Sequence, residues 1–139
     1  MRSAVVDTNV LVRAFLKPDS SDGKVVYLAF KDELRLWYSN KLLTELIRVL
    51  FYPRFKKYNV TQERMRVFID SLISHGNNMP PLTVQLCRDP DDNEILGVAM
   101  AVAENNPVVL VSADKERLVL KGHVEGIEII TPQELLKTL

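Results

Sequence analysis

The chain has 139 residues, of which 47% are hydrophobic and 26% are charged, and its 18 basic residues balance 18 acidic ones at a mean hydropathy of −0.01. A chain of this length buries roughly 70% of the surface that it exposes when unfolded. We therefore expect one domain over residues 1–139 that needs no structural metal. The single cysteine, Cys87, excludes an internal disulfide and is typical of a reducing compartment.

The sequence contains no segment suited to a membrane. The longest apolar run is Ile95–Ala103, whereas a spanning helix needs about 20 apolar residues. Asp7 interrupts the N-terminal apolar run before the hydrophobic region of a signal peptide could form. These features predict a cytoplasmic protein without a membrane interaction.

Hydrophobic periodicity and helix-breaking residues in the first half of the chain predict strands that alternate with helices. In chain order, the expected elements are a strand at Ser3–Val6, a helix at Val10–Leu16, a helix at Lys24–Asp32, a strand at Leu34–Tyr38, a helix that begins at Asn40 and stops before Pro53, and a helix capped by Thr61 that runs to about Ser74.

The second half continues the alternation after a loop predicted at residues 77–82. The expected elements are a helix at Glu94–Ala103 after a polar turn, a strand at Val108–Val111, a short helix at Lys115–Leu120, a strand at Ile127–Ile130, and a last helix that begins at a capping box of Thr131 and Glu134. Such alternation is typical of an α/β fold with a mostly parallel sheet.

Acidic residues follow the predicted strands at the points where ligands bind in parallel α/β sheets. Asp7 comes directly after the first strand, and Asp114 follows the strand at residues 108–111. Asp92 enters the helix after the polar turn, with Asp89 and Asp91 as neighbours. Each aspartate taken alone is better explained as a helix N-cap. Together they predict an acidic site at one edge of the sheet.

Glu45 adds a fourth carboxylate to this group. On a helical wheel it lies at the boundary between an apolar arc and a polar arc, beside Val49. A carboxylate in this position is costly unless it is paired or bound to a metal, although a long side chain can also reach out to solvent.

Four converging carboxylates repel one another and raise one another's pKa values unless a cation neutralises them. Mg²⁺ and Mn²⁺ prefer oxygen ligands and suit a site without histidine or cysteine. Such ions lower the pKa of a bound water, and a second ion can stabilise the leaving oxygen when a phosphodiester is hydrolysed. The residues therefore predict a phosphate ester as the substrate.

The four acidic positions lie in sequence blocks that resemble those of PIN domains, most closely the VapC-like toxins of toxin-antitoxin pairs. The blocks are Val5–Leu11 (VVDTNVL), Thr44–Leu46 (TEL), Asp89–Ile95 (DPDDNEI) and Val111–Lys115 (VSADK). All four occur in the family's order and spacing, and the resemblance covers essentially the whole chain.

The resemblance implies a three-layer α/β/α fold with about five strands and the cleavage of single-stranded RNA by one or two Mg²⁺ or Mn²⁺ ions. Asp7, Glu45, Asp92 and Asp114 match the metal-binding catalytic acids. The supporting positions are Thr8, Asn9, Asp89, Asp91 and Ser112. The resemblance also implies an antitoxin that covers the site, and a homodimer.

A basic stretch supplies candidate contacts for the RNA. Residues 1–70 carry 13 basic and 8 acidic side chains, whereas residues 71–139 carry 5 and 10. Aromatic and basic side chains alternate near the centre of the basic half, which suits a flexible strand because bases stack on rings while phosphates meet cations. Its candidates are Arg54, Lys56, Lys57 and Tyr58, and the alternative is a loop that packs its own rings.

Two other functions fit parts of the sequence. An inactive PIN-like module would bind RNA or a protein without cutting, although all four acids are present. A Mg²⁺-dependent phosphotransfer domain would use Asp7 as its phosphoacceptor. Asn9 stands where haloacid-dehalogenase-like domains have a second aspartate, which counts against that interpretation.

Overall fold

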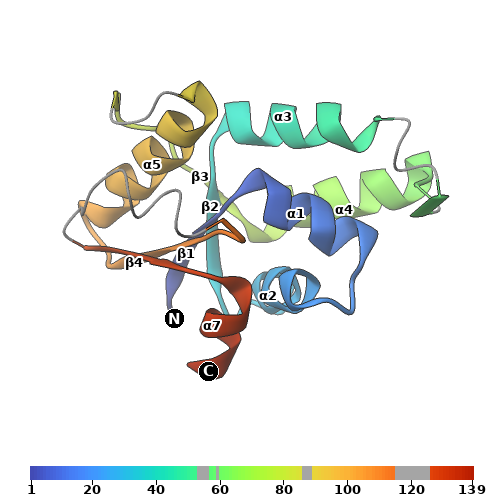
Figure 1. The fold of residues 1–139 in the computed structure, drawn as a ribbon, viewed down its shortest axis with the longest axis horizontal. Helices are drawn as coiled ribbons and strands as arrows, with labels where there is room; N and C mark the ends of the chain where they lie inside the picture. The colour runs from blue at the N-terminus through green and yellow to red at the C-terminus, as the bar shows by residue number, and fades with distance from the viewer. Residues whose placement is uncertain (53–56, 59, 86–88, 115–125) are drawn as a thin grey trace.

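A computed structural model describes residues 1–52, 57–58, 60–85, 89–114 and 126–139 of the chain. Within these ranges, strands and helices alternate as the sequence predicts (Figure 1). In chain order, the elements are β1 (Ser3–Val6), α1 (Thr8–Leu16), α2 (Ser21–Phe30), β2 (Arg35–Tyr38), α3 (Asn40–Leu50), α4 (Gln62–His75), β3 (Asn77–Asn78), α5 (Pro90–Ala103), β4 (Val108–Val111), β5 (Ile127–Ile130) and α7 (Pro132–Lys137).

The five strands form an all-parallel sheet in the order β3-β2-β1-β4-β5. The chain moves outward from β1 to β2 and β3, and then returns to add β4 on the other side of β1. In the register of the central pair, Val6 lies opposite Val111. The order of the strands therefore reverses between β1 and β4, and the crevice at the carboxyl ends of such a pair is where open α/β sheets bind ligands.

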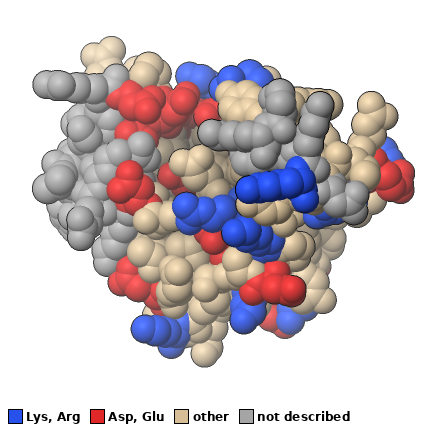
Figure 2. Space-filling model, turned by 45° about the vertical axis from the view of Figure 1, so that its right-hand side comes forward, with Lys and Arg blue, Asp and Glu red and all other residues tan. Residues whose placement is uncertain are grey.

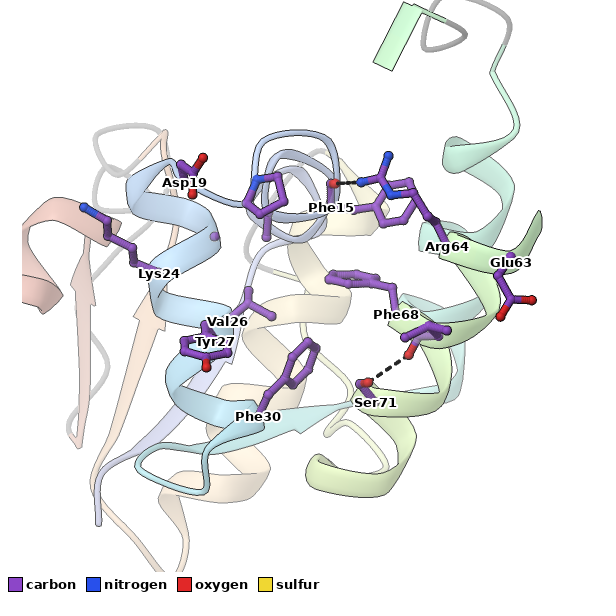
Figure 3. A pocket seen from close by; sticks show the side chains of 14 residues that line it. Phe15, Asp19, Lys24, Val26, Tyr27, Phe30, Glu63, Arg64, Phe68 and Ser71 are labelled. Carbon is purple, nitrogen blue, oxygen red and sulfur yellow. Dashed lines mark hydrogen bonds between the residues drawn. The ribbon is translucent and has the colours of Figure 1, made fainter. Parts of the chain in front are cut away.

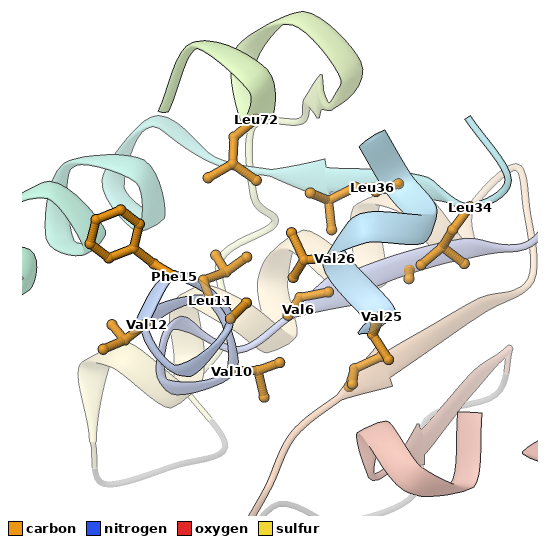
Figure 4. Packing of buried hydrophobic residues seen from close by; sticks show 14 of the residues in the cluster. Val6, Val10, Leu11, Val12, Phe15, Val25, Val26, Leu34, Leu36 and Leu72 are labelled. Carbon is orange, nitrogen blue, oxygen red and sulfur yellow. The ribbon is translucent and has the colours of Figure 1, made fainter. Parts of the chain in front are cut away.

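Alternating strand residues divide the core between the two faces of the sheet. Ala4, Val6 and Val111 belong to a cluster with α1, α2, α3, α4 and α7, part of which Figure 4 shows. Val5 and Leu110 point the other way, into a cluster with α5. The sheet thus has helices on both faces, which confirms the predicted three-layer α/β/α architecture.

Short polar side chains set the starts of several helices. Ser20 accepts a hydrogen bond from the Gly23 amide at 3.1 Å, so α2 begins at Ser21, ahead of the start predicted at Lys24. Thr61 caps α4 as expected, through the Arg64 amide at 3.1 Å. The capping box predicted at Thr131 is present at the start of α7.

Two further boundaries differ from the sequence prediction. Residues Asn77 and Asn78, expected to lie in a loop, pair with β2 as strand β3, which is too short to show a periodicity of its own. Helix α5 begins at Pro90 rather than Glu94, because Asp89 caps it and proline suits the first helical position. Asp91 and Asp92 consequently lie in the first turn of α5.

The predicted helix at residues 115–120 lies outside the described ranges. No helix among the described residues is long and apolar enough to cross a bilayer.

Candidate functional site

The carboxyl ends of β1 and β4 bring Asp7, Ser112 and Asp114 together. The Asp7 amide donates to the Val111 carbonyl oxygen at 2.9 Å, which extends the pairing of the two strands. The Ser112 hydroxyl donates to Asp7 Oδ2 at 3.0 Å and accepts a hydrogen bond from the Asp114 amide at 3.1 Å. Because Ser112 is fully buried, this bridge holds the two acidic positions at one edge of the sheet, as the sequence predicts.

Asp7 occupies the N-cap position of α1, but its side chain makes no capping hydrogen bond. Its carbonyl oxygen accepts from the amides of Val10 and Leu11, whereas its carboxylate accepts from Ser112 on the neighbouring strand. The explanation of Asp7 as a simple side-chain cap is therefore wrong. Its carboxylate is directed toward the end of β4.

Glu45 lies on α3, half-buried, and its carboxyl group lies near that of Asp91 on α5. Burial raises the pKa of Glu45, and the nearby charges of Asp91 and Asp7 raise it further, while Arg48 lowers it. Burial and the neighbouring acidic groups therefore disfavour the ionised form of Glu45 at this site.

A second contact joins the helices that carry Glu45 and Asp91. Ser39 caps α3 by accepting from the Leu42 amide at 3.2 Å, and its hydroxyl donates to Glu94 Oε2 of α5 at 2.5 Å. Ser39 is 2% exposed, so water does not compete for these bonds. The first turns of α3 and α5 are therefore held against each other beside the acidic side chains.

The other acidic-site candidates differ in their surroundings. Asp89 caps α5 by accepting from the Asp91 amide at 2.9 Å, which agrees with its alternative explanation as a cap. Asp92 is 6% exposed in the first turn of the same helix. At the start of α1, Thr8 is buried and Asn9 is exposed. The structure pairs Glu45 with Asp91, and the role of Asp92 as the third ligand stays a prediction.

Two of the four RNA-contact candidates, Arg54 and Lys56, lie outside the described residues. Tyr58 has Lys57 Nζ at 5.2 Å and Lys17 Nζ at 5.8 Å from its ring centroid. Its carbonyl oxygen accepts from Arg64 Nη1 at 2.9 Å. The tyrosine ring therefore lies among cationic side chains.

The acidic side chains suit a divalent cation in their chemistry. All are oxygen donors, and a cation would relieve the repulsion that raises the pKa of Glu45. Among the described residues, no three acidic, histidine or cysteine side chains lie close enough together to hold a metal ion. Mg²⁺ needs only one or two protein carboxylates because it keeps several waters. Two of these carboxylates, such as those of Glu45 and Asp91, would therefore be enough to hold such an ion.

A separate pocket of about 630 Å³ lies between α1, α2 and α4. Figure 3 shows Phe15, Phe30 and Phe68 along its wall, and the ring centroids of Phe15 and Phe68 are 5.3 Å apart. Tyr27 and Val67 line it as well and are 59% and 51% exposed. None of the acidic-site residues lines this pocket, and its surface is mainly apolar.

Ser39 and Glu94 were not predicted to belong to the site or its surroundings, whereas Arg48 and Tyr52 lie in the basic stretch that the sequence offers for RNA. The position of Ser39 between a strand and a helix is a recognisable cap signal, and Arg48 lies three residues after Glu45 on the same helix. The bond between Ser39 and Glu94 joins residues 55 positions apart and required the tertiary structure.

Comparison with known proteins gives two matches. The sequence profile of the PIN domain matches residues 3–116, which include every acidic candidate. The chain is also 28% identical over 137 residues to MJ1680, an uncharacterized protein of Methanocaldococcus jannaschii, and this similarity covers 96% of the chain and 88% of that protein.

Replacing Glu45 with glutamine tests the charge balance of the site. Because the folded state raises the pKa of Glu45, it binds the proton more tightly than the unfolded state does, and the wild type loses stability as pH rises through that range. In EDTA, we expect Glu45→Gln to increase the free energy of unfolding at pH 7. The gain should vanish at a pH below the ordinary glutamate pKa. Urea unfolding at both pH values measures it, and a variant less stable than wild type at pH 7 would contradict the assignment.

Proposed function

The chain belongs to the PIN-domain family, and from this membership we propose that it is a metal-dependent endoribonuclease that cleaves single-stranded RNA. PIN domains are typically Mg²⁺-dependent nucleases. The choice of RNA rests on the resemblance to VapC-like toxins and on the basic surface near the acidic residues.

The observation that carries the proposal is the convergence of carboxyl groups from three elements. Asp7 follows β1, Glu45 lies on α3 and Asp91 lies on α5, and the charges of Asp7 and Asp91 both raise the pKa of Glu45. A fold gains no stability from such a grouping, because like charges repel and the pKa of Glu45 is raised. A carboxyl group with a raised pKa at the ligand-binding edge of a sheet is typical of a functional site.

Some residues of the chain would hold the cation, and others would position the side chains that bind it. Asp7 and Glu45, with Asp92 or Asp91 and Asp114, would hold Mg²⁺ or Mn²⁺. When bound, such ions lower the pKa of a water and neutralise charge on the phosphate. Ser112 orients the Asp7 carboxylate through the 3.0 Å hydrogen bond. The hydrogen bond between Ser39 and Glu94 holds the start of α3 against α5.

The proposal predicts that the purified chain cleaves a labelled, unstructured RNA in Mn²⁺ or Mg²⁺ but not in EDTA. Asp7→Asn should abolish cleavage while leaving the fold intact, because it removes a charge and keeps the shape of the side chain. We expect a rate loss of at least about 100-fold, measured by gel electrophoresis of the products and comparable to the loss of a major electrostatic contribution.

Arg66→Ala is the matched control for handling and contamination. Arg66 is exposed on α4, where it contacts Glu63 at 3.0 Å and Asp70 at 3.5 Å. This variant should cleave like wild type. Equal cleavage by wild type and Asp7→Asn would reveal a contaminating nuclease and contradict the proposal. Absence of both cleavage and metal binding would favour the inactive RNA- or protein-binding module, and a covalent phosphate on Asp7 would favour phosphotransfer.

We also propose that the chain is the toxin of a toxin-antitoxin pair, as its resemblance to VapC-like toxins implies. This role requires an antitoxin that inhibits cleavage, and the resemblance also implies a second subunit. The pocket between α1, α2 and α4 supports a protein partner, because it exposes Tyr27 and Val67 beside an aromatic wall. Burying apolar area of this kind contributes roughly 25 cal/mol per Å². We assign the pocket to the antitoxin and expect the homodimer to form elsewhere.

Light scattering of wild type and Val67→Asp tests this assignment. The side chain of Val67 is half-exposed, so the substitution should leave the fold intact while placing a charge in the apolar pocket. We expect both proteins to be dimers with equal dissociation constants. Dissociation of the variant alone would place the second subunit in the pocket, and a monomeric wild type would contradict the predicted homodimer.

A further inference from the structure

Two exposed basic side chains flank Glu45 along one stripe of α3. At 100° per residue, Lys41, Glu45 and Arg48 fall within an arc of about 60°. Lys41 and Arg48 are separated by about 10 Å along the helix axis, given a rise of 1.5 Å per residue, and the acidic side chain lies between them. Both basic residues are exposed, whereas Glu45 is half-buried. The stripe therefore presents positive charge on either side of the acidic site.

Arg48 is held in place by Tyr52, which follows the last turn of α3. Arg48 Nη1 donates to the tyrosine hydroxyl oxygen at 2.7 Å, and the guanidinium carbon lies 5.8 Å from the ring centroid. A guanidinium group has five N–H donors, so this bond leaves donors for a phosphate. Fixing the long side chain also lowers the entropy that it would lose on binding.

The stripe differs from the other charged surfaces of the described residues. Within those residues, the ion pairs shorter than 4 Å involve neither Lys41 nor Arg48, whereas Arg66 on α4 contacts two acids. Arg48 still acts on Glu45, whose pKa it lowers. Figure 2 shows lysine and arginine side chains at the upper edge of one face, at the height of α3 in Figure 1, beside a group of acidic side chains.

We propose that Lys41 and Arg48 bind the backbone phosphates on either side of the bond that is cleaved, and that Tyr52 positions Arg48 for this contact. The inference rests on the proposed ribonuclease function and names the residues that place RNA at its site. The strand would run along α3, with one phosphate at each basic side chain and the intervening phosphodiester beside Glu45. Arginine and phosphate form directed, charge-assisted hydrogen bonds, which set the register of the strand.

Binding of a fluorescently labelled, unstructured RNA in EDTA tests the inference without cleavage. The readout is the dissociation constant from anisotropy at several salt concentrations. Each phosphate contact on a single strand contributes about −0.7 to the slope of log affinity against log salt. We expect Arg48→Ala to weaken binding about tenfold, or about 1.4 kcal/mol, and to reduce the steepness by about 0.7. The double variant Lys41→Ala/Arg48→Ala should reduce the steepness by about 1.4.

Two further variants distinguish the positioning of Arg48 from a general effect of positive charge on RNA binding. Arg66→Ala removes the same charge from a paired site on α4 and should bind like wild type. Tyr52→Phe keeps the ring and the charge of Arg48, so it should weaken binding less than Arg48→Ala does and leave the salt slope unchanged. Thermal unfolding checks that each variant is folded.

The outcomes distinguish this inference from the function on which it rests. Equal affinity and slope for Arg48→Ala and Arg66→Ala would overturn it, even where wild type cleaves RNA in Mn²⁺. Failure of wild type to bind RNA in EDTA would overturn it as well. The predicted loss of affinity and slope would support it, including where no metal-dependent cleavage is found and the nuclease proposal fails.

Discussion

The parallel pairing of β1 with β4 determines where the acidic residues of the site can lie. Because both strands end at the same edge of the sheet, the residues that follow them meet there, and the buried Ser112 hydroxyl joins Asp7 to the Asp114 backbone. The change of direction in strand order occurs between these two strands. A one-residue shift of β4 would turn Val111 away from its core cluster and move Ser112 away from Asp7.

Helices α3 and α5 complete the site at a cost in electrostatic energy. Glu45 and Asp91 are brought close together, and burial and the repulsion between their charges raise the pKa of Glu45. The contact of Ser39 with Glu94 holds the same two helices together. Packing and hydrogen bonds elsewhere thus offset a grouping of charges that is unfavourable by itself, as is common at functional sites.

The sequence predicted the architecture well because its signals are local. The strands at residues 3–6, 108–111 and 127–130 are short apolar runs, and Thr61 and Thr131 are clear caps. It missed β3, whose two residues carry no periodicity, and the early start of α5, where an acidic turn resembles a loop. Strand order was not predicted, since it depends on contacts between distant segments.

The site was predictable at the level of which elements supply its acids. Asp7 and Asp114 follow strands, and the helical wheel placed Glu45 at the edge of an apolar face. The partner of Glu45 could not be read from spacing, because Asp91 and Asp92 are adjacent and their side chains leave α5 in different directions. The position of the Arg48 side chain could not be predicted either, because it depends on a hydrogen bond to Tyr52, a residue that lies beyond the end of α3.

The most direct test of the shared acidic site is an NMR titration of the Glu45 carboxyl carbon. In the absence of divalent ions, we expect the pKa of Glu45 to lie above its ordinary value of 4.5, and to fall in Asp91→Asn. Adding Mg²⁺ to the wild type should lower the pKa, because a bound cation favours the ionised carboxylate. A Glu45 that titrates at its ordinary pKa and responds neither to Asp91→Asn nor to Mg²⁺ would contradict the convergence of these acids on one cation.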